Sequence, residues 1–168
     1  MHKASFPLLV ALSVVGSGCA GGAPAPAAPG GCEIAPVGPL IGYTYQPSAA
    51  PPPQGGPIVD GVYDLVEAVV YGKASGPWSS DQAPAVRLAM KLTTEDRAAG
   101  PQGRVVMSMN LPPALECQTG RFAAIGAEIR TQTTGSHSKL ESNAYTTGPD
   151  TLTVFQRANH TYVFRRRP

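Results

Sequence analysis

The residues with the most distinctive chemistry in this chain of 168 residues are three cysteines, Cys19, Cys32 and Cys117. A cysteine thiol can carry a lipid, form a disulfide, bind a metal or act as a nucleophile. Zinc sites need several Cys or His residues at short spacings, and neither the cysteines nor His137 and His160 provide them. The sequence also contains no Gly-x-Ser-x-Gly motif and no phosphate-binding loop. We therefore expect no metal, no cofactor and no enzymatic activity.

The N-terminal segment predicts export. Lys3 gives the N-terminus a positive charge, and residues 6–15 are mostly apolar. A run of this length is too short to cross a bilayer, which needs about 20 apolar residues. It matches the central region of a secretory signal peptide. We therefore assign residues 1–18 to a signal peptide that is removed on export.

Small residues surround the first cysteine, in the order Gly16-Ser17-Gly18-Cys19-Ala20. This pattern resembles the lipobox of bacterial lipoproteins, although Gly16 stands where the lipobox usually has a branched apolar residue. The resemblance implies a lipid on Cys19 and attachment to the membrane through that lipid. It also implies a place in the cell envelope, as an outer membrane lipoprotein that faces the periplasm or the cell surface. Ordinary cleavage one or two residues later is the alternative, and it predicts a secreted protein.

The other two cysteines are expected to form a disulfide. If Cys19 carries a lipid, Cys32 and Cys117 remain as a pair. Disulfides persist in the compartments that exported proteins occupy. A bond between these two residues would stabilise the fold by roughly 4–5 kcal/mol in the chain-entropy model. Two free thiols are the alternative.

Composition divides the mature chain into two parts. Residues 19–58 are rich in Ala, Pro and Gly, which favour extended polyproline geometry and cannot bury a core. We predict that they form a tether after the lipid anchor, with the apolar piece at residues 39–45 packed against the domain that follows. The net charge of +2, with one basic cluster at residues 165–167, argues against nucleic acid as a partner.

Residues 59–168 predict an all-β domain. Apolar and polar residues alternate in segments that turn signals separate, which is the pattern of strands with one buried and one solvated face. The only candidate for a helical turn lies at residues 93–99. Seven strands are expected, over residues 61–72, 86–92, 104–111, 121–131, 139–146, 152–157 and 162–165.

This arrangement fits a closed antiparallel up-and-down barrel of seven or eight strands. Gly61-Val62-Tyr63, at the start of the first strand, resembles the Gly-x-Trp opening of lipocalins, with Tyr in place of Trp. The arginines at residues 165–167 lie where lipocalins carry a basic residue over that aromatic ring. The resemblance covers residues 59–168 and implies a lipocalin-like barrel with one apolar ligand among its inward side chains. A β-sandwich is the alternative fold.

Three methionines, Met90, Met107 and Met109, occupy alternate positions of two neighbouring strands. They would line a soft pocket if their common face points into the barrel, because methionine adapts to irregular shapes. The same side chains could instead fill a solid core. The other side chains expected to point inward are Leu65, Val69, Val86, Leu88 and Leu111.

Two kinds of function follow from these interpretations. The leading one is an exported envelope lipoprotein that binds a small apolar ligand or has a passive envelope role. The groups expected at the mouth of its pocket are Tyr63, Tyr71 and Trp78, with Trp78 in a loop that would cover the barrel. The alternative is a protein-binding module. Periplasmic protease inhibitors of bacteria are similar in combining a small barrel, one disulfide and an N-terminal segment that enters the target.

Lipidation of Cys19 can be tested directly. Globomycin, which blocks the lipoprotein signal peptidase, should cause the uncleaved form to accumulate, and Cys19→Ala should abolish labelling by a lipid precursor. Cys32→Ala is the control and should keep the label. A mature N-terminus that begins after Ala20 would contradict the prediction.

Overall fold

The computed structural model describes residues 32–72, 85–96, 100–111, 114–134, 139–156 and 159–168. Within these ranges the chain forms nine strands and no helix, and therefore no helix that could cross a membrane. The strands are β1 (Tyr43–Gln46), β2 (Gly61–Tyr71), β3 (Arg87–Asp96), β4 (Gln102–Leu111), β5 (Ala114–Ile125), β6 (Glu128–Thr134), β7 (Leu140–Thr147), β8 (Thr151–Gln156) and β9 (His160–Arg166).

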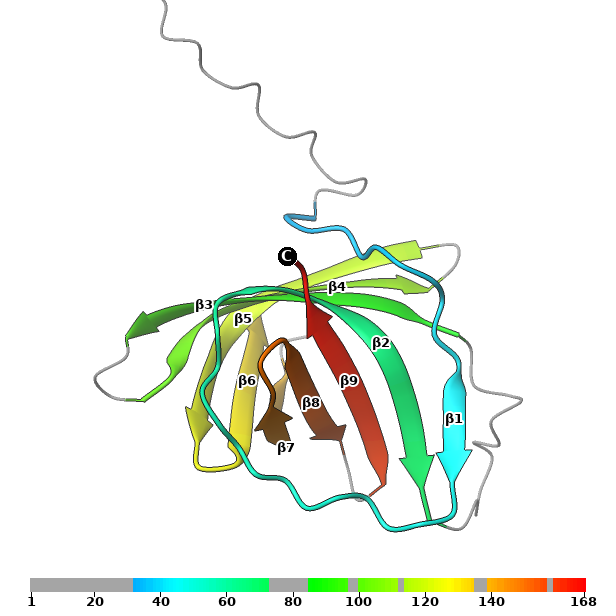
Figure 1. The fold of residues 1–168 in the computed structure, drawn as a ribbon. Helices are drawn as coiled ribbons and strands as arrows, with labels where there is room; N and C mark the ends of the chain where they lie inside the picture. Colours follow the sequence, from blue (N-terminus) through cyan, green and yellow to red (C-terminus); the bar gives the residue numbers. More distant parts are fainter. Residues whose placement is uncertain (1–31, 73–84, 97–99, 112–113, 135–138, 157–158) are drawn as a thin grey trace, which may run out of the picture.

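Strands β2 to β9 form a closed antiparallel barrel (Figure 1). Each strand pairs with the next one along the chain, and β2 also pairs with β9, which closes the ring. Closure satisfies the backbone groups that an open sheet would leave along its edges. The predicted up-and-down barrel is confirmed, and the alternative of a β-sandwich is wrong.

The single strand predicted over residues 121–131 is wrong, because the chain reverses direction within it. β5 ends at Ile125, and a two-residue turn of Gly126 and Ala127 leads into β6. Gly126 has a φ of 60°, a left-handed conformation that costs glycine little. Ile125 is therefore 67% exposed at the turn. The reversal brings the barrel to eight strands. The segment considered for a helical turn continues β3 as far as Asp96.

A β-bulge in β2 changes which of its side chains point inward. The register with β9 shifts just after Leu65, so that β2 carries an extra residue there. Beyond the bulge Ala68 lies opposite Tyr162, whose side chain points into the barrel. Val69 therefore points outward, and the prediction that it faces the interior is wrong. Strict alternation cannot anticipate a bulge, because one inserted residue moves every later side chain to the other face.

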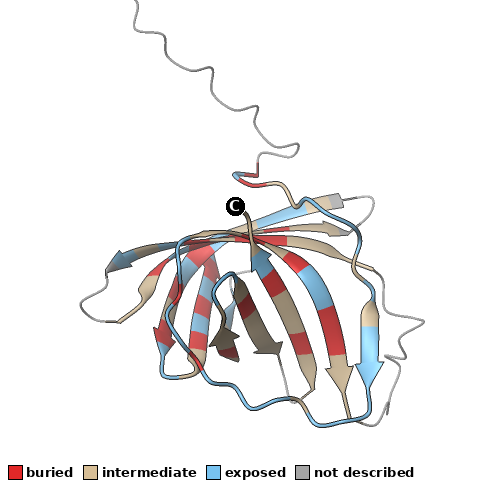
Figure 2. Ribbon diagram, viewed as in Figure 1, coloured by how far each residue is buried: buried red, intermediate tan, exposed pale blue. Residues whose placement is uncertain are grey.

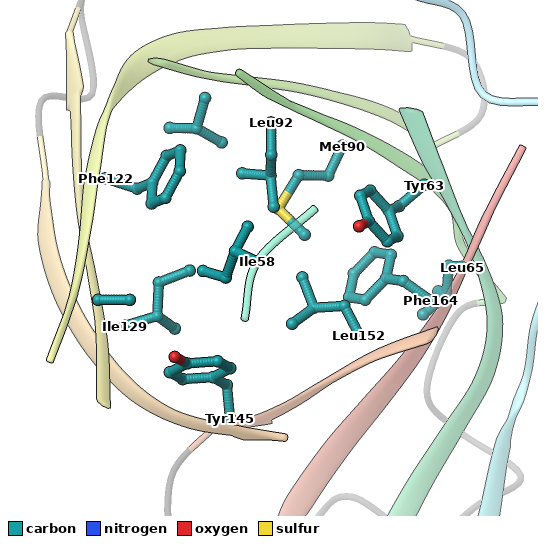
Figure 3. Close-up of a cluster of buried hydrophobic side chains, with 12 residues drawn as sticks. Ile58, Tyr63, Leu65, Met90, Leu92, Phe122, Ile129, Tyr145, Leu152 and Phe164 are labelled. Atoms are coloured by element: carbon teal, nitrogen blue, oxygen red, sulfur yellow. The ribbon is translucent and has the colours of Figure 1, made fainter. Parts of the chain in front are cut away.

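The barrel is filled at the end where β2 begins, here called the closed end. Residues 54–60 cross this end, and the backbone of Gly55 bonds to Tyr145 at 2.8 Å and to Thr147 at 2.9 Å. This places Ile58 inside the barrel, among side chains that converge from the surrounding strands (Figure 3). Figure 2 shows buried residues at intervals along barrel strands such as β2, β6 and β9, and none on β1. The 12 core residues are Ile58, Tyr63, Leu65, Met90, Leu92, Val105, Phe122, Ala124, Ile129, Tyr145, Leu152 and Phe164.

Residues 32–41, here called the strap, lie on the outer face of the barrel. Cys32 is joined to Cys117 on β5, with their Cα atoms 5.7 Å apart, as the predicted pairing requires. Ile34 is buried against Ala89 and Val106, which point outward from β3 and β4. The segment assigned to a tether is thus attached to the barrel at Cys32 and Ile34.

Charged groups also hold the strap. Glu33 accepts a hydrogen bond from Lys91 at 2.5 Å and pairs with Arg104 at 2.8 Å. The hydrogen bond from Lys91 and the charges of both cations lower the pKa of the Glu33 carboxyl. Arg167 bridges the strap to β2, because it donates to the carbonyl of Ala35 and to the carboxylate of Asp64, each at 2.7 Å. Exposed ion pairs contribute only about 0–1 kcal/mol each, so the disulfide and the contacts of Ile34 provide most of the attachment.

β1 fills a gap between β2 and β3. β2 pairs with β3 only through Gly61–Asp64, and at its other end it pairs with β1 in parallel, through Ala68–Tyr71. The opposite edge of β2 is occupied by β9, so β1 must lie on the side of β3. Ile41 completes the link, since its backbone exchanges hydrogen bonds of 2.8 and 2.9 Å with Val86, just before β3.

The disulfide should be the strongest single attachment of the strap. Cys32→Ser and Cys117→Ser should each lower the free energy of unfolding by about 2–5 kcal/mol, because the cross-link restricts the unfolded chain. Urea unfolding of the exported protein measures this loss, with Cys19→Ser as the control. Two alkylatable thiols from Cys32 and Cys117 in unreduced, denatured protein would contradict the pairing.

Candidate functional site

A cavity of about 380 Å³ lies inside the barrel, beyond the core that fills the closed end. Met90, Ile129 and Phe164 belong both to the core and to the cavity lining, and they form its floor. This volume falls in the range of small-molecule sites. The lining consists of Tyr43, Val86, Leu88, Met90, Met107, Met109, Glu116, Gln118, Ile129, Thr131, Thr133, Lys139, Glu141, Asn143, Val154, Gln156, Tyr162 and Phe164.

The cavity exists because the size of the inward side chains changes along the strands. At the closed end Phe122, Tyr145 and Leu152 point inward, and Ile58 fills the space between them. Farther along β6 the inward side chains are the short Thr131 and Thr133, which alternate in burial with their exposed neighbours. Short side chains do not reach the barrel axis, so eight strands leave room for one small molecule there.

One side of the cavity is apolar, and we call it the apolar arc: Val86, Leu88, Met90, Met107 and Met109. In the pairing of β3 with β4, Met90 lies opposite Met107, and Leu88 lies opposite Met109. Side chains opposite each other on neighbouring strands share a face, so the predicted methionine surface does line the cavity. The arc offers a polarisable, adaptable surface to an apolar molecule.

The facing side is mainly polar, although Val154 of β8 also belongs to it, and we call its polar residues the polar arc: Glu116, Gln118, Thr131, Thr133, Glu141, Asn143 and Gln156. These side chains come from β5 to β8. Glu116 lies opposite Met109, and Gln118 lies opposite Met107, so the boundary between the two arcs runs between β4 and β5. Sequence reasoning missed the polar arc because it assigned apolar residues to the interior. The alternation of Ile129, Thr131 and Thr133 was the available signal.

Two tyrosines close the side of the cavity where β1 meets the barrel. The hydroxyl oxygens of Tyr43 and Tyr162 lie 2.7 Å apart, and the two rings meet edge to face with centroids 6.1 Å apart. Tyr43 makes a second edge contact with the ring of His160, also at 6.1 Å. Sequence reasoning did not select Tyr43, because it lies in a segment of tether-like composition.

Of the three aromatic residues predicted at the mouth, Tyr63 and Tyr71 lie elsewhere. Tyr63 is 4% exposed in the packed core, where its hydroxyl donates to the carbonyl of Val59 at 2.6 Å. Burial raises the pKa of the Tyr63 phenol. Tyr71 ends β2, where its amide donates to the carbonyl of Asn159 at 2.8 Å, and it does not line the cavity. Trp78 lies outside the described residues.

The lining is equipped for binding. It combines an apolar surface with hydroxyl, amide and carboxylate groups that can orient a ligand. Lys139 and Glu141 form an ion pair of 2.5 Å within it. In the part of the chain that the structure describes, no three His, Cys, Asp or Glu side chains gather in a way that could hold a metal ion.

A pair of alanine substitutions distinguishes the filled end from the hollow one. Leu92→Ala should lower the free energy of unfolding by about 2–5 kcal/mol, because Leu92 is only 1% exposed in the core. Met109→Ala should cost about 1 kcal/mol or less, since Met109 borders the cavity and loses few packing contacts. Urea unfolding followed by circular dichroism measures both values. Equal losses would mean that both ends of the barrel are packed.

Comparison with protein-family models, with curated proteins and with solved structures gives no match to this chain. The barrel and its two-sided cavity are therefore the observations on which a function has to rest.

Proposed function

We propose that this chain is an exported envelope lipoprotein whose lipocalin-like barrel binds one small molecule with a mainly apolar body. The observation that carries the proposal is the cavity of about 380 Å³ inside the barrel. Its floor of Met90, Ile129 and Phe164 and its apolar arc would remove the body of such a ligand from water. Burial of apolar surface contributes roughly 25 cal/mol for each Å², and this supplies the affinity.

Contacts at the closed end favour the lipocalin-like interpretation. Arg166 lies opposite Tyr63 in the pairing of β2 with β9, as the lipocalin resemblance implies for a basic residue beside the opening aromatic ring. Its side chain runs so close to Gly61 that a Cβ atom there would meet the Arg166 Cδ at 2.9 Å. Asp150 holds the guanidinium from the other side at 2.8 Å. These contacts give Gly61, Tyr63 and Arg166 a joint structural role.

The disulfide favours export. A cross-link between Cys32 and Cys117 is expected to persist in an oxidising compartment and not in the cytosol. Because the strap begins at Cys32, the residues between Cys19 and Cys32 would connect a lipid on Cys19 to the outer face of β5.

The alternative of a protease inhibitor receives less support. Such a module would need an N-terminal segment that is free to enter its target. Here the described part of that segment is attached by the Cys32 disulfide, the packing of Ile34 and the hydrogen bond to Ala35, and the chain continues into β1, which is part of the sheet. A passive envelope role would not account for the cavity or for its division into two arcs.

Ligand binding is tested by titration with N-phenyl-1-naphthylamine, an uncharged apolar dye that fluoresces when it is removed from water. The wild type should bind it saturably, and Met107→Arg should abolish binding, because the new cation would have to be desolvated in the apolar arc. Ile125→Arg is the matched control, since the same residue type is placed on an exposed turn.

Met109→Trp serves as a second variant, because it fills the cavity without adding charge and should also reduce binding. Circular dichroism checks that each variant retains the barrel. Absence of saturable binding in the wild type, or equal binding by wild type and both cavity variants, would contradict the proposal.

A further inference from the structure

We infer that the ligand of this cavity is a cationic amphiphile, with an alkyl or aryl body and a protonated amine as its head. The inference rests on the proposed ligand-binding function and adds the class of ligand. It is carried by the division of the cavity wall into an apolar arc and a polar arc, and by the charged side chains of the cavity lining.

The division of the wall specifies an amphiphile. A purely apolar ligand would match only the apolar arc and would offer no hydrogen bond to the amide groups of Gln118, Asn143 and Gln156 in the polar arc. Such groups lose free energy when they are taken from water without a hydrogen bond. A ligand with a polar head satisfies these groups, while its apolar body contacts Met90, Met107 and Met109.

The charged side chains of the lining indicate which charge the head of the ligand should carry. Glu116, Glu141 and Lys139 are the charged side chains in the described lining. Lys139 is paired with Glu141 at 2.5 Å, so its charge is already compensated. Within the described ranges no cation pairs with Glu116, and the lining therefore carries an excess of one negative charge. A ligand ammonium group would complement this charge, and a ligand carboxylate would be repelled.

The position of Glu116 also suits this geometry. It lies directly opposite Met109, at the boundary between the two arcs. On β5 the next inward residue is Gln118, which lies opposite Met107 and nearer the floor. If the ammonium group binds at Glu116, the body of the ligand can lie along the methionines. Gln118 is then available to form a hydrogen bond with a second polar group.

The test uses three probes with the same ten-carbon chain: decylamine, decanol and decanoate. Each displaces N-phenyl-1-naphthylamine from the exported wild-type protein at pH 7, where the heads are cationic, neutral and anionic. Decylamine should bind tightest and decanoate weakest, with a preference for the amine over the alcohol of about fivefold, as expected for a partly exposed ion pair.

Two variants assign the preference to Glu116. Glu116→Gln should remove the advantage of decylamine over decanol, so that the two probes bind the variant with equal affinity. Glu116→Lys should invert the order, so that decanoate binds more tightly than decylamine. Glu95→Gln is the matched control, because Glu95 is an exposed carboxylate outside the cavity and its loss changes the net charge by the same amount.

The outcomes separate this inference from the proposed function. If the dye binds but decanoate displaces it as well as decylamine does, or if Glu116→Gln leaves the ratio unchanged, the cationic ligand is wrong and the ligand-binding barrel stands. If the probes displace the dye but all three bind with equal affinity, the inference also fails. If the wild type binds no dye, the proposed function fails, and the inference fails with it.

Discussion

The division of hydrogen bonds along β2 is the constraint on which the rest of the structure depends. One edge of β2 is bonded to β9, and the other is shared between β3 at the closed end and β1 beyond it. A barrel in which β2 and β3 diverge would leave backbone groups without partners. β1 supplies those partners, and this requires the chain before β2 to stay on the barrel. The strap and its disulfide meet that requirement, because they fix the chain on the outer face shortly before β1 begins.

The same arrangement explains how the cavity acquires its walls. β1 places Tyr43 against Tyr162, so part of the lining comes from a segment that precedes the barrel in sequence. At the other end, residues 54–60 bring Ile58 into the interior and fill the space that eight strands would otherwise leave. Stability and the proposed ligand binding therefore depend on different ends of one barrel. The closed end buries large side chains, and the opposite half keeps short or polar ones around an open space.

Polar side chains inside a barrel are costly unless they bond to something. In this chain they are gathered on four consecutive strands, while the methionines occupy the two strands before them. Scattered polar residues would point to a water-filled interior. Their segregation creates a wall with two chemistries, and the registers Met109–Glu116 and Met107–Gln118 place the boundary along one strand pair. In the proposed function, this boundary would orient the ligand.

How much of this structure the sequence alone predicted depends on how far apart in the chain the interacting residues are. Alternation along single strands is local, so it predicted the all-β barrel and the common face of Met90, Met107 and Met109. Cysteine parity predicted the pair Cys32 and Cys117. Tertiary structure alone decided the rest. The bulge after Leu65 depends on how β2 and β9 pair to close the ring. The place of β1 between β2 and β3 arises from pairings between segments that are separated in the chain. The inward direction of the polar arc is settled by the barrel as a whole and not by the hydrophobicity of each strand.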